Sequence, residues 1–352
     1  MKNGIRKTAR LARQAASRLA GRRIPLFVQL MTTERCNLSC RYCYAEFGGR
    51  RRPDFPLEPL LQVIDGLGRL GCAFVMLAGG EPMLRKDIGA VIGRVKAAGM
   101  DCSLNTNGLM VPERIEEIAG TDLLSISLDG PPDIHDYYRG EGTYRKVIEA
   151  IEAGRHRGIR VQLQFTLTRD LAQAFAQVES VAREYGCFIG INFLRPQDKI
   201  EGVRVEAAEA SDEEIGVFLD DLIRHPRRVL PYPKHILRYV RRWPYGFGRH
   251  LITDREDLKS FRPIPCQSGR YLAAIDNRGD IFPCTKLFYS EPLGNCLDGD
   301  IEGAWLRLKP VNCQACLDLG CNLINDLLRF HPLALAGLLR NWRPRARRPA
   351  GR

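Results

Sequence analysis

The run Cys36-Asn37-Leu38-Ser39-Cys40-Arg41-Tyr42-Cys43 determines how the rest of this chain is interpreted. Its spacing of three and then two residues allows three thiolates to converge on one small inorganic group. A structural metal site closes its shell with four protein ligands, whereas a reactive site keeps one position open. Three thiolates on a cubane of four irons would leave one iron free to bind a substrate or a cofactor.

The three cysteines are also compatible with two arrangements that involve no open iron. They could belong to a zinc site whose fourth ligand lies elsewhere, or to a disulfide framework in a secreted domain. Disulfides fit poorly, because the chain has no apolar signal segment and its remaining cysteines are scattered through a large globular sequence. Spacing alone leaves zinc open.

Three further motifs follow the cysteines in order. They are Gly79-Gly80-Glu81-Pro82, Asn105-Thr106-Asn107-Gly108 and Ser125-Ile126-Ser127-Leu128-Asp129-Gly130. Together with the cysteine run, whose last cysteine follows an aromatic residue, this succession resembles the radical S-adenosylmethionine (SAM) superfamily. The resemblance implies an α/β fold, an open partial (β/α)6 barrel, with the motifs at the carboxyl ends of its strands.

The resemblance also implies the cofactors. Cys36, Cys40 and Cys43 would hold a [4Fe-4S] cluster whose open iron binds SAM, and reductive cleavage of SAM would give a 5′-deoxyadenosyl radical. A low-potential donor such as flavodoxin or ferredoxin would supply the electron.

Roles for the residues around SAM follow from their chemistry. Gly79 and Gly80 would allow close backbone approach, Glu81 would accept the methionine ammonium, and Pro82 would fix the turn. The other three expected contacts are Tyr42 against the adenine, Ser127 on the methionine carboxylate, and Arg139 neutralising that carboxylate. Purely structural hydrogen bonds remain the alternative for Ser127 and Arg139.

Short apolar segments alternate with helical stretches between residues 27 and 195, which predicts parallel strands joined by right-handed crossovers. The expected strands are Phe27–Thr32, Phe74–Leu77, Cys102–Asn105, Leu123–Leu128, Val161–Thr166 and Phe188–Phe193. The expected helices include Pro59–Leu70, Asp87–Ala98, Tyr144–Arg157, Ala172–Tyr185 and Asp212–Arg224. The chain then divides into a basic segment 1–25, the barrel 26–195, a bridge 196–262, a small cysteine-rich iron–sulfur domain 263–326 and a tail 327–352.

A second set of cysteines resembles the SPASM extension or its shorter relative, twitch. Its members are Cys266, Cys284, Cys313, Cys316 and Cys321. The full SPASM pattern has more cysteines, so the resemblance implies one auxiliary [4Fe-4S] cluster on the first four, with Cys321 as a spare or substitute ligand. A structural zinc ribbon is the alternative. Of the remaining cysteines, which are expected in the core, Cys187 is a candidate hydrogen-atom donor.

Positive charge is concentrated at both ends of the chain, whose net charge is +12. Residues 5–19 and 330–342 each read as an amphipathic helix flanked by arginines. Peripheral contact at the inner face of a membrane is therefore one hypothesis. A solvated cationic face, or a helix packed on the barrel, would produce the same pattern. The twelve cysteines, as metal ligands in a reducing compartment, predict a cytoplasmic protein. No apolar stretch approaches the ~20 residues that span a bilayer.

The predicted function is hydrogen-atom abstraction from a small metabolite, a sugar, a lipid-linked molecule or a peptide. A ribosomal-peptide maturase is one alternative, although about 26 residues before the first strand leave little room for a leader-binding domain. A zinc-stabilised nucleic-acid-binding protein and an electron-transfer subunit are alternatives from different classes. No nucleic acid is expected as a partner, because the segment 313–323 around the last cysteines is mostly neutral or apolar.

Overall fold

The structure is a computed structural model that describes most of the chain. The described residues are 14, 16, 17, 20–43, 53–194, 210–258, 260–287, 292–297, 299–310 and 313–335. The hypotheses on residues 5–19 and 330–342 therefore lie largely outside the described residues.

Six parallel strands form the body of the sheet, and their order confirms the predicted partial barrel. The sheet runs β6-β5-β4-β3-β2-β1, with every neighbouring pair parallel. The strands are β1 (Phe27–Thr33), β2 (Phe74–Gly79), β3 (Asp101–Thr106), β4 (Leu123–Ser127), β5 (Arg160–Thr166) and β6 (Phe188–Asn192). All six expected strands are present.

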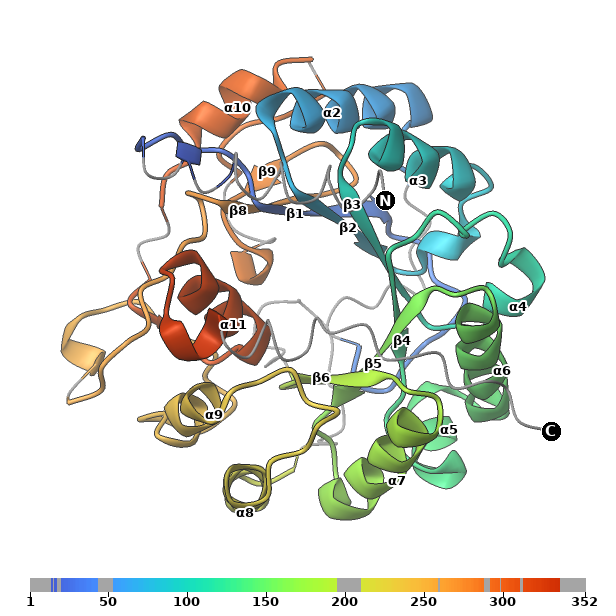
Figure 1. The fold of residues 1–352 in the computed structure, drawn as a ribbon, viewed down its shortest axis with the longest axis vertical. Coiled ribbons are helices and arrows are strands. Elements are labelled where there is room, and N and C mark those ends of the chain that lie inside the picture. Colours follow the sequence, from blue (N-terminus) through green and yellow to red (C-terminus); the bar gives the residue numbers. More distant parts are fainter. Residues whose placement is uncertain are drawn as a thin grey trace.

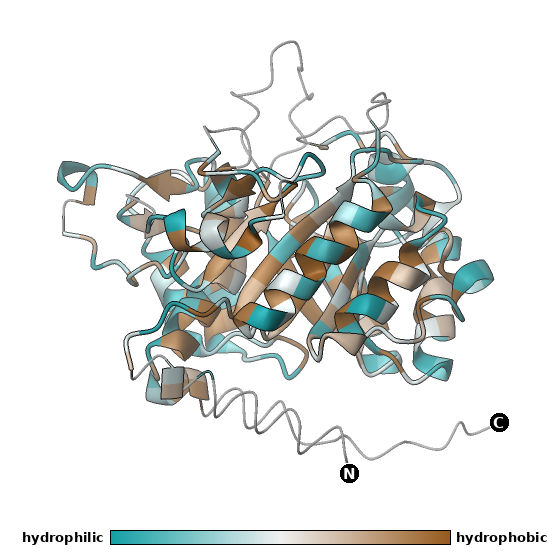
Figure 2. Ribbon diagram, turned by 90° about the horizontal axis from the view of Figure 1, so that it is seen from above, coloured by the Kyte–Doolittle hydropathy of each residue, from teal (hydrophilic) through white to brown (hydrophobic). Residues whose placement is uncertain are grey.

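Helices between these strands cover the outer face of the curved sheet (Figure 1). They are α2 (Leu57–Leu70), α3 (Ile88–Ala97), α4 (Val111–Arg114), α5 (Pro132–Arg139), α6 (Thr143–His156) and α7 (Leu171–Glu184). In α2 the buried residues Leu60, Val63, Ile64 and Leu67 recur at helical spacing, so one side of the helix faces the sheet. Figure 2 shows the resulting alternation of apolar and polar bands along the helices.

The cysteine-rich region extends the same sheet, an arrangement that the sequence did not reveal. β8 (Leu272–Ile275) pairs parallel with β1, and β9 (Ile281–Phe282) pairs antiparallel with β8. β8 is buried at every position, so this part of the expected small domain shares the core of the barrel. The second set of cysteines is thereby brought toward the first.

The remaining α-helices and strands lie around the two ends of the main sheet. They are α8 (Asp212–Arg224), α9 (Lys234–Arg241), β7 (Leu251–Ile252), α10 (Ile301–Arg307), β10 (Ala315–Cys316) and α11 (Leu319–Leu328). α11 contacts both β6 and α9, and in Figure 1 it lies between the β6 and β8 ends of the sheet. It therefore narrows the opening of the partial barrel.

One described residue near the start of the chain is anchored to the barrel. Gln14 is buried, and its Nε2 donates hydrogen bonds to the carbonyls of Pro25, at 3.0 Å, and Gly71, at 2.7 Å. This contact agrees with the packed-helix alternative for that position. Among the described residues, no helix is both long and apolar enough to cross a membrane.

Candidate active site

The three cysteines of the first run lie together in the loop that follows β1. All three are half-buried, and the amide of Cys43 donates to the carbonyl of Cys40 at 3.0 Å. Burial raises the pKa of Cys36 to about 11, and the neighbouring thiols of Cys40 and Cys43 act in the same direction. As thiolates the three side chains would repel one another, and bound iron would offset this repulsion. The three cysteines therefore suit a thiolate-binding group such as an iron–sulfur cluster.

Two glycines at the end of β2 allow that strand to approach the cysteine loop. The amide of Gly80 donates to the carbonyl of Thr33 at 2.9 Å, and a Cβ on Gly80 would stand 2.3 Å from the carbonyl oxygen of Arg35. At Gly79, whose φ is +150°, a Cβ would stand 2.2 Å from the carbonyl oxygen of Thr33. The close approach that the sequence predicted is therefore one of backbone to backbone.

Glu81 is fully buried, and its carboxylate binds backbone and side-chain donors of the protein. Oε1 accepts from the amide of Met83 at 2.9 Å and from the hydroxyl of Thr106 at 2.8 Å, while Oε2 accepts from the amide of Asn107 at 2.7 Å. Burial raises the pKa of Glu81 although these hydrogen bonds oppose the shift. We expected this carboxylate to bind the methionine ammonium; in the structure both of its oxygens accept hydrogen bonds from the protein. Pro82 begins a short 3-10 turn, as expected.

Asn107 extends the same connection to the cysteine loop. Its Nδ2 donates to Oδ1 of Asn37, which lies next to Cys36, at 2.8 Å. The sequence predicted that Asn107 shapes its turn, and its Oδ1 does accept from the amide of Leu109 at 3.1 Å. The role of Asn37 was missed, because no spacing or composition signal separates it from an ordinary loop residue.

A buried cluster of polar and charged side chains, the charge cluster, joins the loop that carries Cys43 to the segment that follows β4. Asp129 is 0% exposed, and its Oδ2 accepts from the phenol of Tyr42 at 2.5 Å and from Nε of Arg139. Burial alone would raise the pKa of Asp129, but Arg139, His135 and the hydrogen bonds together lower it. The charge of Arg139 is thus already matched within the protein, and the phenol of Tyr42 is committed to the same cluster. For Arg139 this is the structural alternative that the sequence left open.

Ser127 and Cys187, two more of the expected site residues, lie at opposite edges of the sheet. Ser127 is half-buried at the last position of β4, on the carboxyl edge where the motifs gather. Cys187 is 1% exposed in the main core, immediately before β6 begins. It therefore lies at the amino end of its strand, away from the edge where the cysteine loop and the motifs gather.

The second set of cysteines forms one group, which we call the five-cysteine group. The thiol of Cys313 donates to that of Cys266, and with donors from Ser268 this lowers the pKa of Cys266 to about 6. Cys321 hydrogen-bonds to Cys316, and charge interactions join Cys284 to both pairs. Convergent soft donors of this kind suit a closed iron–sulfur cluster. Cys321 belongs to the group, so one more thiol is present than such a cluster needs.

The two cysteine sets are linked through the hairpin of β8 and β9. Cys36 and Cys43 pack against a small buried cluster of Met31, Ala274 and Phe282. Phe282 is the last residue of β9, and Cys284 follows it by two positions. The extension of the sheet beside β1 therefore sets the separation between the two sets.

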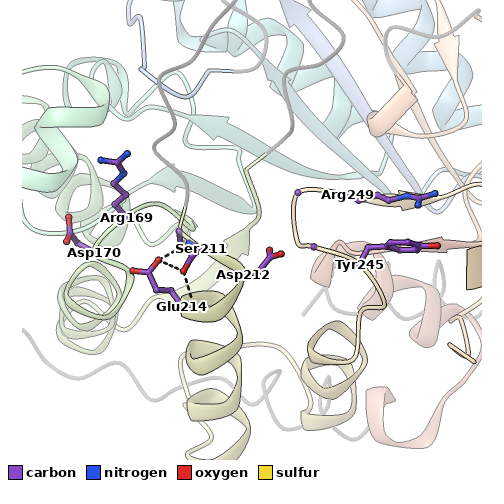
Figure 3. A pocket seen from close by; sticks show the side chains of 10 residues that line it. Arg169, Asp170, Ser211, Asp212, Glu214, Tyr245 and Arg249 are labelled. Carbon is purple, nitrogen blue, oxygen red and sulfur yellow. Dashed lines mark hydrogen bonds between the residues drawn. The ribbon is translucent and has the colours of Figure 1, made fainter. Parts of the chain in front are cut away.

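A charged pocket lies beyond the end of β5. Arg169, Asp170, Ser211 and Glu214 line one side, while Tyr245 and Arg249 line the other (Figure 3). The pocket is near the charge cluster, because Tyr138 hydrogen-bonds to the 168–169 segment and its ring lies 5.7 Å from that of Tyr42. The sequence did not single out these pocket residues, since they come from two loops and the start of α8, which only the fold brings together.

The geometry defines an α/β protein with an iron–sulfur site at the carboxyl edge of its strands. The family description "Radical SAM superfamily" matches residues 30–170. An AdoMet-dependent heme synthase from Nitratidesulfovibrio vulgaris is 30% identical over 265 residues, which cover 72% of each chain. The chain belongs to the radical SAM superfamily, and it is a radical SAM enzyme that binds a [4Fe-4S] cluster and SAM.

Two further relatives extend this result. Mycofactocin maturase MftC from Mycobacterium tuberculosis is 26% identical over 290 residues, covering 80% of this chain and 70% of that protein. The crystal structure of Streptococcus suis SuiB bound to S-adenosylmethionine has a similar fold, with a TM-score of 0.62 at 15% identity, over 80% of this chain and 66% of that one. Family membership favours the enzyme hypothesis over the zinc-stabilised and electron-transfer alternatives.

Proposed function

We propose that Cys36, Cys40 and Cys43 hold the SAM-binding cluster, and that the loops after β2, β3 and β4 form the surrounding pocket. When bound, the reduced cluster and SAM supply a 5′-deoxyadenosyl radical that takes a hydrogen atom from the substrate. The observation that carries this proposal is the hydrogen-bonded connection from Glu81 through Asn107 to Asn37, which fixes three loops around the cysteines. Such fixed loops orient a bound cofactor and keep water away from it.

In this arrangement the backbone at Gly79–Glu81 offers polar groups to SAM. The side chains of Glu81 and Arg139 act by holding the loops, because their charges are satisfied within the protein. Ser127 remains the side chain best placed to donate a hydrogen bond to the methionine carboxylate, since it ends β4 at the same edge.

We further propose that four members of the five-cysteine group hold one auxiliary [4Fe-4S] cluster. Their convergence, and the contact of the first cysteine set with Phe282 two residues before Cys284, support a location close to the radical site. A cluster there can accept or pass an electron during turnover, and a low-potential donor would reduce the first cluster.

For the substrate we propose a peptide. The similarity to a mycofactocin maturase over 80% of this chain supports this class, as does the fold shared with SuiB, whose crystal structure has also been determined bound to the precursor peptide SuiA. A haem precursor is the second candidate. It is favoured by the 30% identity to a heme synthase and by Arg169, whose guanidinium group lines the charged pocket and suits a substrate carboxylate.

The first test measures SAM cleavage by the anaerobically reconstituted full chain. With dithionite, we expect 5′-deoxyadenosine from the wild type and none from Cys40→Ala, while Cys296→Ala, outside both cysteine sets, retains it. Equal product from the wild type and Cys40→Ala would contradict the assignment of the first cluster.

The second test identifies the substrate class. The enzyme is co-expressed with short peptides encoded beside its gene, and peptide masses are compared with those from the Cys40→Ala variant. A mass change that depends on Cys40 supports a peptide substrate. Unchanged peptides together with Cys40-dependent conversion of an iron porphyrin would replace it by the second candidate.

A further inference from the structure

Two histidines and a carboxylate meet at the end of α11, on residues that belong to neither cysteine set. His235 lies in α9, Asp326 lies in the last turn of α11, and His331 follows that helix. One potential ligand atom from each of the three lies within 4.8 Å of the other two. None of these residues takes part in the proposed radical site.

An unusual turn brings His331 back to Asp326. The amide of His331 donates to the carbonyl of Asp326 at 2.9 Å, and that of Phe330 to the carbonyl of Leu327 at 3.1 Å. This is a Schellman ending, which usually has glycine at the left-handed position. Here Phe330 adopts a φ of 58°, at a cost of about 1–2 kcal/mol. The strained turn holds the second histidine against the carboxylate.

The side chains of the three residues form a compact donor set. His235 Nε2 lies 2.9 Å from Asp326 Oδ2, and the two imidazole rings lie 4.5 Å apart with 23° between their planes. Two atoms bound to one metal at ~2.1 Å, with angles of 90° to 109°, stand roughly 3.0 to 3.4 Å apart. The spacing of the first pair is therefore close to that of neighbouring ligands.

The hydrogen bond between His235 and Asp326 does not satisfy this group. The Nδ1 atoms of His235 and His331 are both buried without a hydrogen-bond partner in the described part of the chain. Leaving a buried polar atom unpaired costs about 1–3 kcal/mol. Asp326 is 3% exposed on its side chain, and Nη1 of Arg329 stays 3.8 Å from its Oδ1. A bound cation would compensate the buried carboxylate. It would take Nε2 of His235 and an oxygen of Asp326 at the spacing given above, and the unpaired Nδ1 of His331 would complete the donor set.

The chemistry of the donors specifies the class of ion. We propose that His235, Asp326 and His331 bind one first-row divalent cation of the zinc class, separate from the iron–sulfur clusters. Imidazole nitrogens and a carboxylate are borderline donors that suit such ions, whereas iron–sulfur clusters take thiolates. The carboxyl end of a helix also favours positive charge, and Asp326 lies in the last turn of α11.

The position of the site indicates what the ion does. It joins α9 to α11, the helix whose first turn carries Cys321. Asn325, beside Asp326, accepts through its Oδ1 from the amide of Gln267 at 3.0 Å, next to Cys266. The cation would therefore hold α11 in place. That helix carries Cys321, and through Asn325 it contacts the residue next to Cys266.

The test uses the full chain with its clusters loaded under anaerobic conditions, and Zn²⁺ alone as the probe. Zinc is titrated against a chromophoric chelator, and bound zinc and iron are both counted per chain. We expect one zinc ion on the wild type with no loss of iron. Asp326→Asn and His331→Gln should weaken zinc binding by at least about tenfold. His225→Gln, on an exposed histidine at the end of α8, should leave it unchanged.

The circular dichroism of the clusters reports whether each variant is folded. His331→Gln changes a partly exposed residue after the helix, so it keeps the test informative if Asp326→Asn fails to fold. The proposal is overturned if the wild type retains no zinc, if zinc binds only as iron is lost, or if a folded His331→Gln variant binds zinc like the wild type. The last result would reduce the group to a contact between helices.

Discussion

Glu81 accepts a hydrogen bond of 2.7 Å from the backbone amide of Asn107, and this bond joins the carboxyl ends of β2 and β3. The second carboxylate oxygen binds Met83 and Thr106, so one buried side chain fixes two loops at once. The glutamate that we expected to bind the cofactor makes these three hydrogen bonds with the protein's own loops.

Replacing Glu81 with glutamine should destabilise the protein and weaken SAM binding together. A glutamine amide keeps one acceptor oxygen but sets an NH₂ group against a donor on the other side, and an unpaired buried donor costs about 1–3 kcal/mol. We expect a lower thermal midpoint and a higher Kd for SAM, measured by equilibrium dialysis. Glu149→Gln, on the exposed face of α6, is the matched control and should change neither. If Glu81→Gln raised the Kd with no loss of stability, the carboxylate would be binding SAM itself.

Gly80→Ala should reduce the iron content of the first cluster. The added Cβ would stand 2.3 Å from the carbonyl oxygen of Arg35, so the backbone leading into Cys36 must move. Gly93→Ala on α3 is the control, because nothing lies within 4 Å of its Cβ and alanine is favoured in a helix by up to about 1 kcal/mol. Iron and sulfide counts after reconstitution check the comparison. Full iron in Gly80→Ala would contradict the claimed fit between strand and loop.

Asp129→Asn should strongly destabilise the protein. The loss of stability relative to the wild type should be the same at every pH between 6 and 8. The substitution leaves Arg139, 10% exposed on its side chain, without its partner, and breaking a buried pair costs about 3–5 kcal/mol. The pKa of Asp129 is lowered in the folded state, so its stabilising effect is fully present above the ordinary carboxyl pKa of about 4 and is lost as pH falls through the folded value.

Thermal midpoints at pH 6, 7 and 8 test this expectation. Asp220→Asn removes a half-exposed ion pair with Arg241 and should cost no more than about 1 kcal/mol. A difference between wild type and Asp129→Asn that changed markedly across this range would mean that the carboxyl group titrates near neutrality.

The sequence predicted the six parallel strands and their helices, because strands buried on both faces and amphipathic helices have distinct apolar patterns. It also predicted which cysteines gather in two sets. It did not predict β8 beside β1, since four apolar residues at 272–275 carry no sign of their partner. The hydrogen-bond partners of Glu81, Tyr42 and Arg139 were also hidden, because a motif identifies a residue but not which hydrogen bonds satisfy it.

The five-cysteine group allows a sharp test of its ligands. We expect Cys316→Ser to lower the iron content from roughly eight to roughly four per chain, because a closed cubane needs four thiolates. Cys321→Ser should retain roughly eight, since its thiol hydrogen-bonds to Cys316 as the additional member of the group. Cys296→Ser, a buried cysteine outside the group, is the comparison for loss of iron through destabilisation alone. Iron and sulfide analysis with electron paramagnetic resonance of the reduced protein reads out both clusters. If Cys321→Ser lost the second cluster while Cys313→Ser kept it, Cys321 would be the fourth ligand, and the chain would depart from the spacing on which the assignment was based.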